Sequence, residues 1–146
     1  TILGYAPGSK ERELLKQALA DSRSEVIDIP MYIGGEEVHT EQKGKVTPPH
    51  DHQHLLATFS KGTKAHVTQA IDAALAAKAD WENLAWEQRA AIFLKAADLI
   101  AGPYRYKLNA ATMLGQSKNA YQAEIDAACE FIDFLRFQNG SEAFKN

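Results

Sequence analysis

The segment 121–137 constrains the fold more than any other part of this chain. Apolar residues recur along it at the three- and four-residue spacing of an α-helix, and they are Tyr121, Ile125, Ala128, Ile132 and Leu135. Phe131 and Phe134 widen this stripe. A helix that is apolar over so much of its circumference is normally buried between other elements. We therefore expect one long helix here, ended by Asn139-Gly140, with the rest of the chain packed around it.

The acidic residues of this segment do not all share one face. The face opposite the stripe carries Asp126, Glu130 and Asp133. Glu124 instead lines up with Ala128 and Phe131, at offsets of four and seven positions. A carboxylate at the margin of an apolar face costs free energy unless it has a partner. The residues alone favour a helix-start carboxylate, stabilised by the helix dipole and paired with an Arg or Lys, over a functional group.

Composition narrows the class of protein. With 146 residues, 45% of them apolar, the chain fits one compact domain or one piece of a larger protein. Its net charge of −3 gives no footprint for nucleic acid or an anionic membrane, and no apolar run reaches the roughly 18 residues of a membrane span. The first residues lack the pattern of a secretory signal, although a leader already removed stays possible. A single cysteine, Cys129, suits a reducing compartment, so we expect the cytoplasm, with the mitochondrial matrix as the alternative.

The order of elements predicts strands first and helices afterwards. After a first helix capped by Ser9, short strands are expected at 26–29, 31–33, 37–38, 45–47 and 55–59. From residue 63 onward the pattern is helical, with helices at about 63–80, 86–101 and 104–114 before the long one. The chain thus divides into 1–62 and 63–146 and lacks strand–helix–strand alternation.

Catalytic and metal-binding patterns are weak. His50, Asp51, His52 and His54 lie in a loop led by proline, where alternating side chains are more typical of solvent exposure than of a convergent zinc site. Cys129 is in mid-helix without an activating His nearby, which favours an inert thiol. The sequence has neither phosphate-binding loop pattern. We assign no catalytic, cofactor-binding or metal-binding residue.

Longer stretches of the sequence are more specific. The segment 67–101 resembles the first helix pair of the aldehyde dehydrogenase superfamily, and 31–38 (Met-Tyr-Ile-Gly-Gly-Glu-Glu-Val) is similar to that family's opening hairpin. Within the superfamily, 5–12 (Tyr-Ala-Pro-Gly-Ser-Lys-Glu-Arg) and 122–128 (Gln-Ala-Glu-Ile-Asp-Ala-Ala) resemble the 1-pyrroline-5-carboxylate dehydrogenases. The resemblance covers nearly the whole chain.

The resemblance implies NAD-dependent oxidation of glutamate γ-semialdehyde to glutamate in proline catabolism. It implies a parent enzyme of the α/β class with a Rossmann-like cofactor domain. We expect this parent to form homo-oligomers and to have no nucleic acid or membrane partners. Members are several times longer, so we expect this chain to be the N-terminal segment, mostly α with a few short strands. Their nucleotide-binding loop, general base and nucleophilic cysteine would lie downstream, and Cys129 does not match the nucleophile's motif. Alone, the segment is expected to be inactive.

The resemblance implies a substrate-binding role for two residues. Glu124 matches a family carboxylate on the helix that lines the aldehyde-entry pocket, where it would bind the substrate's ammonium group or restrict the pocket's shape. Phe131, two turns on, is a candidate for the pocket wall. Two other functions stay open: a non-catalytic helical interaction module, and another aldehyde dehydrogenase branch, against which the segment 5–12 argues.

Overall fold

The computed structural model describes residues 1–138, and of Gln138 only its backbone. The helices are α1 (Lys10–Ser24), α2 (Lys64–Asn83), α3 (Trp86–Ala101), α4 (Arg105–Gln116), α5 (Ala120–Ala123), the π-helix η1 (Glu124–Cys129) and α6 (Glu130–Gln138). The strands are β1 (Ile27–Ile29), β2 (Met31–Ile33), β3 (Glu36–Val38), β4 (Lys43–Val46) and β5 (Ala57–Ser60). The described part is mostly helical with short strands near its start, which confirms the predicted composition of elements.

Local signals set where the helices begin. The hydroxyl of Ser9 accepts a hydrogen bond from the Arg12 N–H (3.3 Å), as expected of an N-cap. Before α5, the side chain of Asn119 accepts from the Gln122 N–H (2.9 Å), and the Gln122 side chain accepts from the Asn119 N–H (3.1 Å). This reciprocal capping box starts the last helical segment at a fixed residue.

The strands form two small sheets. In one sheet the order is β1-β5-β4, with β1 parallel and β4 antiparallel to β5. In the other, β2 and β3 form the expected hairpin, whose turn residues Gly34 and Gly35 have φ values of 61° and 86°. Positive φ at both positions is what a tight two-residue turn requires, and glycine adopts it without steric cost.

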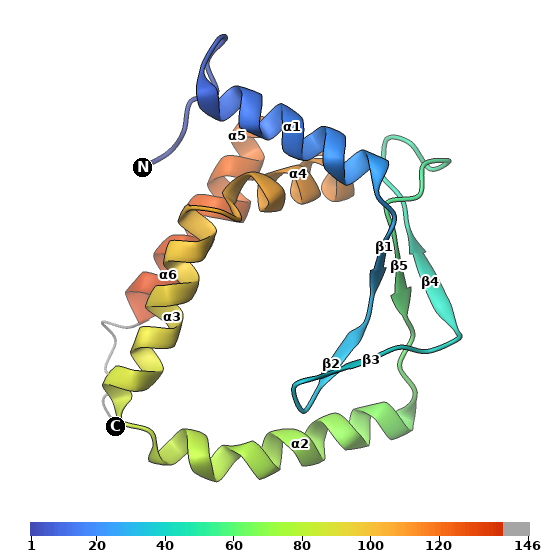
Figure 1. The fold of residues 1–146 in the computed structure, drawn as a ribbon, viewed down its shortest axis with the longest axis vertical. Coiled ribbons are helices and arrows are strands. Elements are labelled where there is room, and N and C mark those ends of the chain that lie inside the picture. The colour runs from blue at the N-terminus through green and yellow to red at the C-terminus, as the bar shows by residue number, and fades with distance from the viewer. Residues whose placement is uncertain (139–146) are drawn as a thin grey trace.

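Helix packing positions the C-terminal segment. Helix α1 lies across α4, and α3 runs beside α6 (Figure 1). The small core between α3 and the last helices contains Ala97, Ala128 and Ile132. Helix α2 packs beside β2 along a separate edge of the molecule (Figure 1) and has no buried residue. Within the described residues, no helix is long and apolar enough to cross a membrane.

The expected single long helix is in fact interrupted by a π-turn. The N–H of Glu130 donates to the carbonyl of Ile125, five residues back, and Ala123 and Ala128, also five apart, are both fully buried. This i→i+5 pattern inserts one extra residue into the turn. The residues after it are therefore rotated relative to an α-helix. Phe131 and Phe134 are 47% and 62% exposed, so the expectation that they widen a buried stripe is wrong.

Three residues of the predicted stripe still face the core, since Ala128 and Ile132 are buried and Leu135 packs against them. Tyr121, at the other end, is 68% exposed. The predicted helix end at Asn139-Gly140 lies outside the described residues.

Candidate functional site

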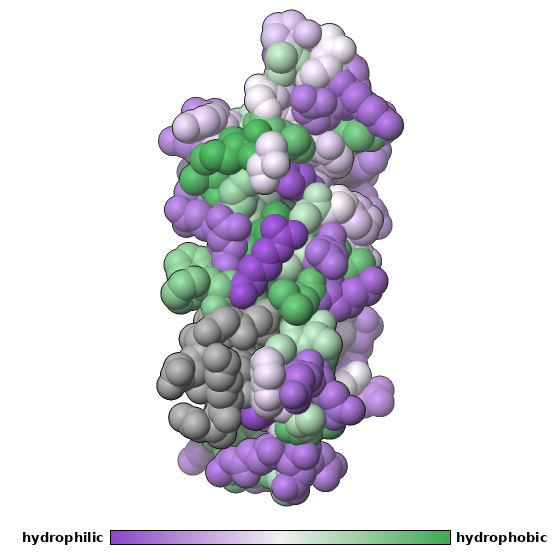
Figure 2. Space-filling view, turned by 90° about the vertical axis from the view of Figure 1, so that its left-hand side faces the viewer, coloured by the Kyte–Doolittle hydropathy of each residue, from purple (hydrophilic) through white to green (hydrophobic). Residues whose placement is uncertain are grey.

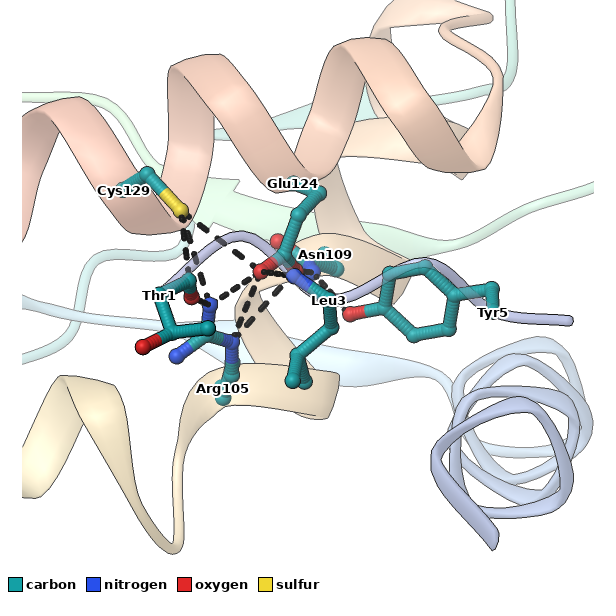
Figure 3. A network of polar contacts seen from close by, with 7 residues as sticks. All are labelled: Thr1, Leu3, Tyr5, Arg105, Asn109, Glu124 and Cys129. Atoms are coloured by element: carbon teal, nitrogen blue, oxygen red, sulfur yellow. Dashed lines mark hydrogen bonds and ion pairs between the residues drawn. The ribbon is translucent and has the colours of Figure 1, made fainter. Parts of the chain in front are cut away.

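Glu124 is the centre of a buried polar cluster. Its side chain has no exposed surface, and the guanidinium of Arg105 forms an ion pair with it through two nitrogens. The carboxylate also accepts hydrogen bonds from the Tyr5 hydroxyl (2.5 Å), the Asn109 amide (2.8 Å) and the Leu3 backbone N–H (3.1 Å). We call Leu3, Tyr5, Arg105, Asn109 and Glu124 the Glu124 cluster (Figure 3).

Three parts of the chain supply this cluster. Arg105 and Asn109 lie four residues apart on α4, which places both side chains on the same helix face. Glu124 begins the π-turn η1, and Tyr5 reaches in from the segment before α1 (Figure 3). Arg105 also donates to the backbone carbonyl of Thr1 (2.8 Å). The cluster therefore joins the first residues of the chain to α4 and η1.

The cluster holds its charges at neutral pH. Burial alone would raise the pKa of Glu124, but the hydrogen bonds from Arg105, Tyr5, Leu3 and Asn109 outweigh it and lower that pKa below 4.5. Burial and the hydrogen bond to Glu124 raise the pKa of Tyr5 well above 10.0, so its hydroxyl remains a donor. The same carboxylate raises the pKa of Arg105. The buried pair is thus ionised and has its hydrogen bonds made, which is the condition for a charge to be buried without a large penalty.

The backbone of Tyr5 is held in an uncommon conformation. Its φ is 49°, in the left-handed region, where a side chain with a Cβ costs about 1–2 kcal/mol. The Tyr5 hydroxyl is fixed at the same time by Glu124 and by the Asn109 amide (2.9 Å). Side-chain contacts at the far end of the ring therefore offset the backbone cost.

Cys129 borders the cluster. Its sulfur is 3.6 Å from a carboxylate oxygen of Glu124 and 3.5 Å from a guanidinium nitrogen of Arg105. The π-turn explains this approach, because residues five apart face the same side of it. Burial and the charge of Glu124 raise the pKa of the half-buried thiol. A raised pKa disfavours the thiolate, which is the nucleophilic form. The inert role expected from the sequence stays a prediction.

Two side chains of the histidine-rich loop have separate partners. The ring of His50 is hydrogen-bonded to the Ser117 hydroxyl (2.7 Å), and Asp51 forms an exposed ion pair with Arg23 (3.3 Å). Among residues 1–138, no three His, Cys, Asp or Glu side chains gather as a metal site would require.

Comparison with known proteins places the chain in a family. The sequence model described as "Aldehyde dehydrogenase family" matches residues 37–143. The chain belongs to this family. Delta-1-pyrroline-5-carboxylate dehydrogenase of Agaricus bisporus is 55% identical over 93% of this chain and 25% of its own length. The human mitochondrial enzyme of the same name is 45% identical over 93% of the chain and 24% of its own length.

Solved structures of aldehyde dehydrogenases agree with this fold. The Delta-pyrroline-5-carboxylate dehydrogenase of Mycobacterium tuberculosis, crystallised with NAD, matches with a TM-score of 0.95 at 47% identity. That match covers 99% of this chain and 27% of the other. The NAD-bound enzyme from Thermus matches with a TM-score of 0.87 at 29% identity, over 96% of this chain and 27% of the other. The chain spans about a quarter of the length of the curated relatives it matches.

The two substrate-binding residues predicted from the family resemblance do not share one buried surface. Glu124 is fully enclosed, whereas Phe131 is 47% exposed beyond the π-turn. Farther along α6, Phe134 and Phe137 line an open hollow with Glu130 and Asp133. A direct contact of Glu124 or Phe131 with substrate stays a prediction.

Sequence reasoning missed the residues that hold Glu124. It expected an Arg or Lys partner but did not name Arg105, which is 7% exposed, nor Asn109, which is fully buried. The available signal was their spacing of four in a helix, beside the buried residue Ala110. The contribution of Tyr5 had no local signal, because it lies 119 positions from Glu124.

Proposed function

We propose that this chain is part of an NAD-dependent 1-pyrroline-5-carboxylate dehydrogenase, which oxidises glutamate γ-semialdehyde to glutamate and reduces NAD. The observation that carries the proposal is the match to the Mycobacterium tuberculosis enzyme, with a TM-score of 0.95 over 99% of this chain at 47% identity. Curated relatives at 44–55% identity bear the same name. The substrate in this proposal is therefore a small molecule with an aldehyde, a carboxylate and an ammonium group.

The described residues fit a supporting part of this enzyme and not its reacting groups. The Cys129 thiol has a raised pKa and lies against a carboxylate, which disfavours the thiolate that attacks an aldehyde. The residues also do not fit NAD, because the sequence has no glycine-rich phosphate loop and the buried guanidinium of Arg105 is already paired with Glu124. We therefore expect no NAD reduction from the 146-residue chain alone.

For Glu124 we propose a positioning role at the substrate pocket. A carboxylate has about four lone-pair sites for hydrogen bonds. Arg105, Tyr5, Asn109 and the Leu3 N–H already use the two oxygens of Glu124. A substrate ammonium group would have to displace one of these donors. The contacts thus favour a carboxylate that fixes η1, and through it the shape of any pocket that the helix lines.

Steady-state kinetics test the proposal. The full polypeptide that carries this sequence should reduce NAD with 1-pyrroline-5-carboxylate, and Glu124→Gln should raise KM for that substrate several-fold by loosening η1. Asp126→Asn is the matched control, since Asp126 lies on the same turn in an exposed pair with Lys118 and should leave KM unchanged. Lack of turnover with 1-pyrroline-5-carboxylate, alongside turnover of simple aliphatic aldehydes, would favour another aldehyde dehydrogenase branch.

The non-catalytic module is the second candidate, and exposed apolar side chains bear on it. The last helix presents Phe134 and Phe137 at 62% and 76% exposure, and α2 presents Val67, Ile71 and Leu75 at 54–62%. Hydrophobic residues also gather at several places on the face seen in Figure 2. Large apolar surfaces mark packing sites, which supports a chain that packs against further protein. A 146-residue chain that sediments as a soluble monomer and unfolds in one cooperative thermal transition would instead support the module.

Assembly and compartment complete the proposal. Formation of homo-oligomers and the lack of nucleic acid or membrane partners stay predictions. Several relatives carry the word mitochondrial in their names, which supports the matrix alternative for this enzyme. The cytoplasmic location stays a prediction that fractionation of the source cells would test.

A further inference from the structure

We propose that residues 1–5 form a strap that is fastened across α4 and η1 by the negative charge of Glu124. The strap is the segment that precedes the turn into α1. Its role, in this proposal, is to close the side of the π-turn on which Cys129 lies. Release of the strap would therefore expose Cys129 and free one end of α4.

The contacts of the strap converge on two side chains. Glu124 accepts from the Leu3 N–H and from the Tyr5 hydroxyl, and Arg105 donates to the Thr1 carbonyl. Figure 3 shows the strap running past the ion pair, with Glu124 between Arg105 and Tyr5. The strap residues are thus bound by partners more than 100 positions away in the sequence.

Backbone strain in the strap is a second and independent observation. Tyr5 has a φ of 49°, which a tyrosine rarely adopts unless its surroundings impose it. The ring is anchored at its hydroxyl by Glu124 and Asn109 (2.5 and 2.9 Å). Loss of this anchor would let the backbone relax to a common conformation, so the strap has a built-in tendency to move away.

The strap also forms one wall of a hollow. Thr1, Ile2 and Leu3 line a cavity of about 530 Å³ together with Arg105 and Cys129. The sulfur of Cys129 lies 3.9 Å from the Thr1 carbonyl. Movement of the strap would widen this hollow on the side of the thiol.

The fastening requires a carboxylate at position 124 and not only a polar side chain of that size. A glutamine offers one acceptor oxygen, and its NH2 group is a donor. In the Glu124 cluster every neighbouring group donates, because Arg105, Asn109, Tyr5 and the Leu3 N–H all point hydrogen atoms at position 124. A glutamine NH2 would face donors and leave part of the strap without an acceptor.

Hydrogen exchange at the Leu3 amide tests the strap directly in the full polypeptide. In Glu124→Gln, exchange at Leu3 should be faster by about tenfold or more, the factor that corresponds to one hydrogen bond to a charged group. Labelling of Cys129 with a maleimide should accelerate in the same variant. Asp126→Asn, on the same turn, should change neither rate, and exchange at Leu15 in α1 reports that the fold is intact.

A second variant keeps the test independent of the folding of the first. Tyr5→Phe removes one hydroxyl from the strap and changes no residue of η1 or α4, where Glu124 and Asn109 each lose one hydrogen bond but keep their other partners. It should also accelerate exchange at Leu3. Unchanged exchange at Leu3 in both variants would overturn the proposal, and so would Cys129 labelling that is equal in Glu124→Gln and in the wild-type protein.

Discussion

Arg105→Met is the perturbation that tests the energetics of the Glu124 cluster. Methionine replaces the aliphatic part of the arginine side chain and removes its charge and its hydrogen-bond donors. Glu124 has no exposed surface, so water cannot replace the hydrogen bonds and the opposite charge that Arg105 supplies. We expect the free energy of opening of this region to fall. The Leu3, Tyr5 and Asn109 donors remain, but they are uncharged and do not neutralise the buried carboxylate.

The magnitude follows from the burial of both partners. Removing one member of a buried ion pair costs about 3–5 kcal/mol, because the other charge is left uncompensated. Lys118→Met is the matched control. Lys118 pairs with Asp126, which lies in η1 as Glu124 does, but the side chains of this pair are 32% and 44% exposed. Exposed pairs contribute about 0–1 kcal/mol. The double variant Arg105→Met/Glu124→Gln should cost less than the sum of the two single changes, since neither charge is then left alone.

The assay is the free energy of opening from hydrogen exchange at the amides of α4 and η1. This measurement reports the region around the cluster even when the rest of the protein unfolds separately. A cost below about 1 kcal/mol for Arg105→Met, or a cost equal to that of Lys118→Met, would refute the reasoning.

Three further predictions concern pH and packing. The pKa of Glu124 is lowered in the folded state, so the ionised carboxylate stabilises the fold fully above the ordinary value of 4.5. This contribution is lost as pH falls through the lower folded pKa, and the protection factor at Leu3 should fall over that acidic range. The pKa of Tyr5 is raised in the folded state, so its protonated hydroxyl stabilises the fold fully below pH 10.0, and this contribution is lost as pH rises above that value. Absorbance titration should find Tyr5 still protonated at a pH where exposed tyrosines have ionised. Gly44→Ala should destabilise the β4–β5 pair by about 1–3 kcal/mol, because the added Cβ meets the ring of Phe59 on the neighbouring strand, and thermal unfolding measures this cost.

Local chemistry made much of the fold predictable from the sequence. Ser9 starts α1, Gly34 and Gly35 form the hairpin turn, and Gly102 ends α3 as expected. Each of these signals acts within a few residues of itself, so no knowledge of the rest of the structure was needed.

The π-turn and the cluster required information that periodicity does not hold. Placing Phe131 in line with Glu124 assumed an uninterrupted α-helix, and the extra residue in η1 made that wrong. The need of Glu124 for a partner was predictable from burial cost. Its donors were not, because Arg105 and Tyr5 lie 19 and 119 positions away and are brought together only by tertiary packing.

We propose that this chain belongs to an enzyme acting on 1-pyrroline-5-carboxylate. The most direct measurement is the initial rate of NADH formation by the purified full polypeptide, with 1-pyrroline-5-carboxylate and with propanal as alternative substrates. We predict a kcat/KM for 1-pyrroline-5-carboxylate far above that for propanal, and no NADH formation by the 146-residue chain. A polypeptide that prefers propanal or reduces no NAD with either substrate would contradict the claim.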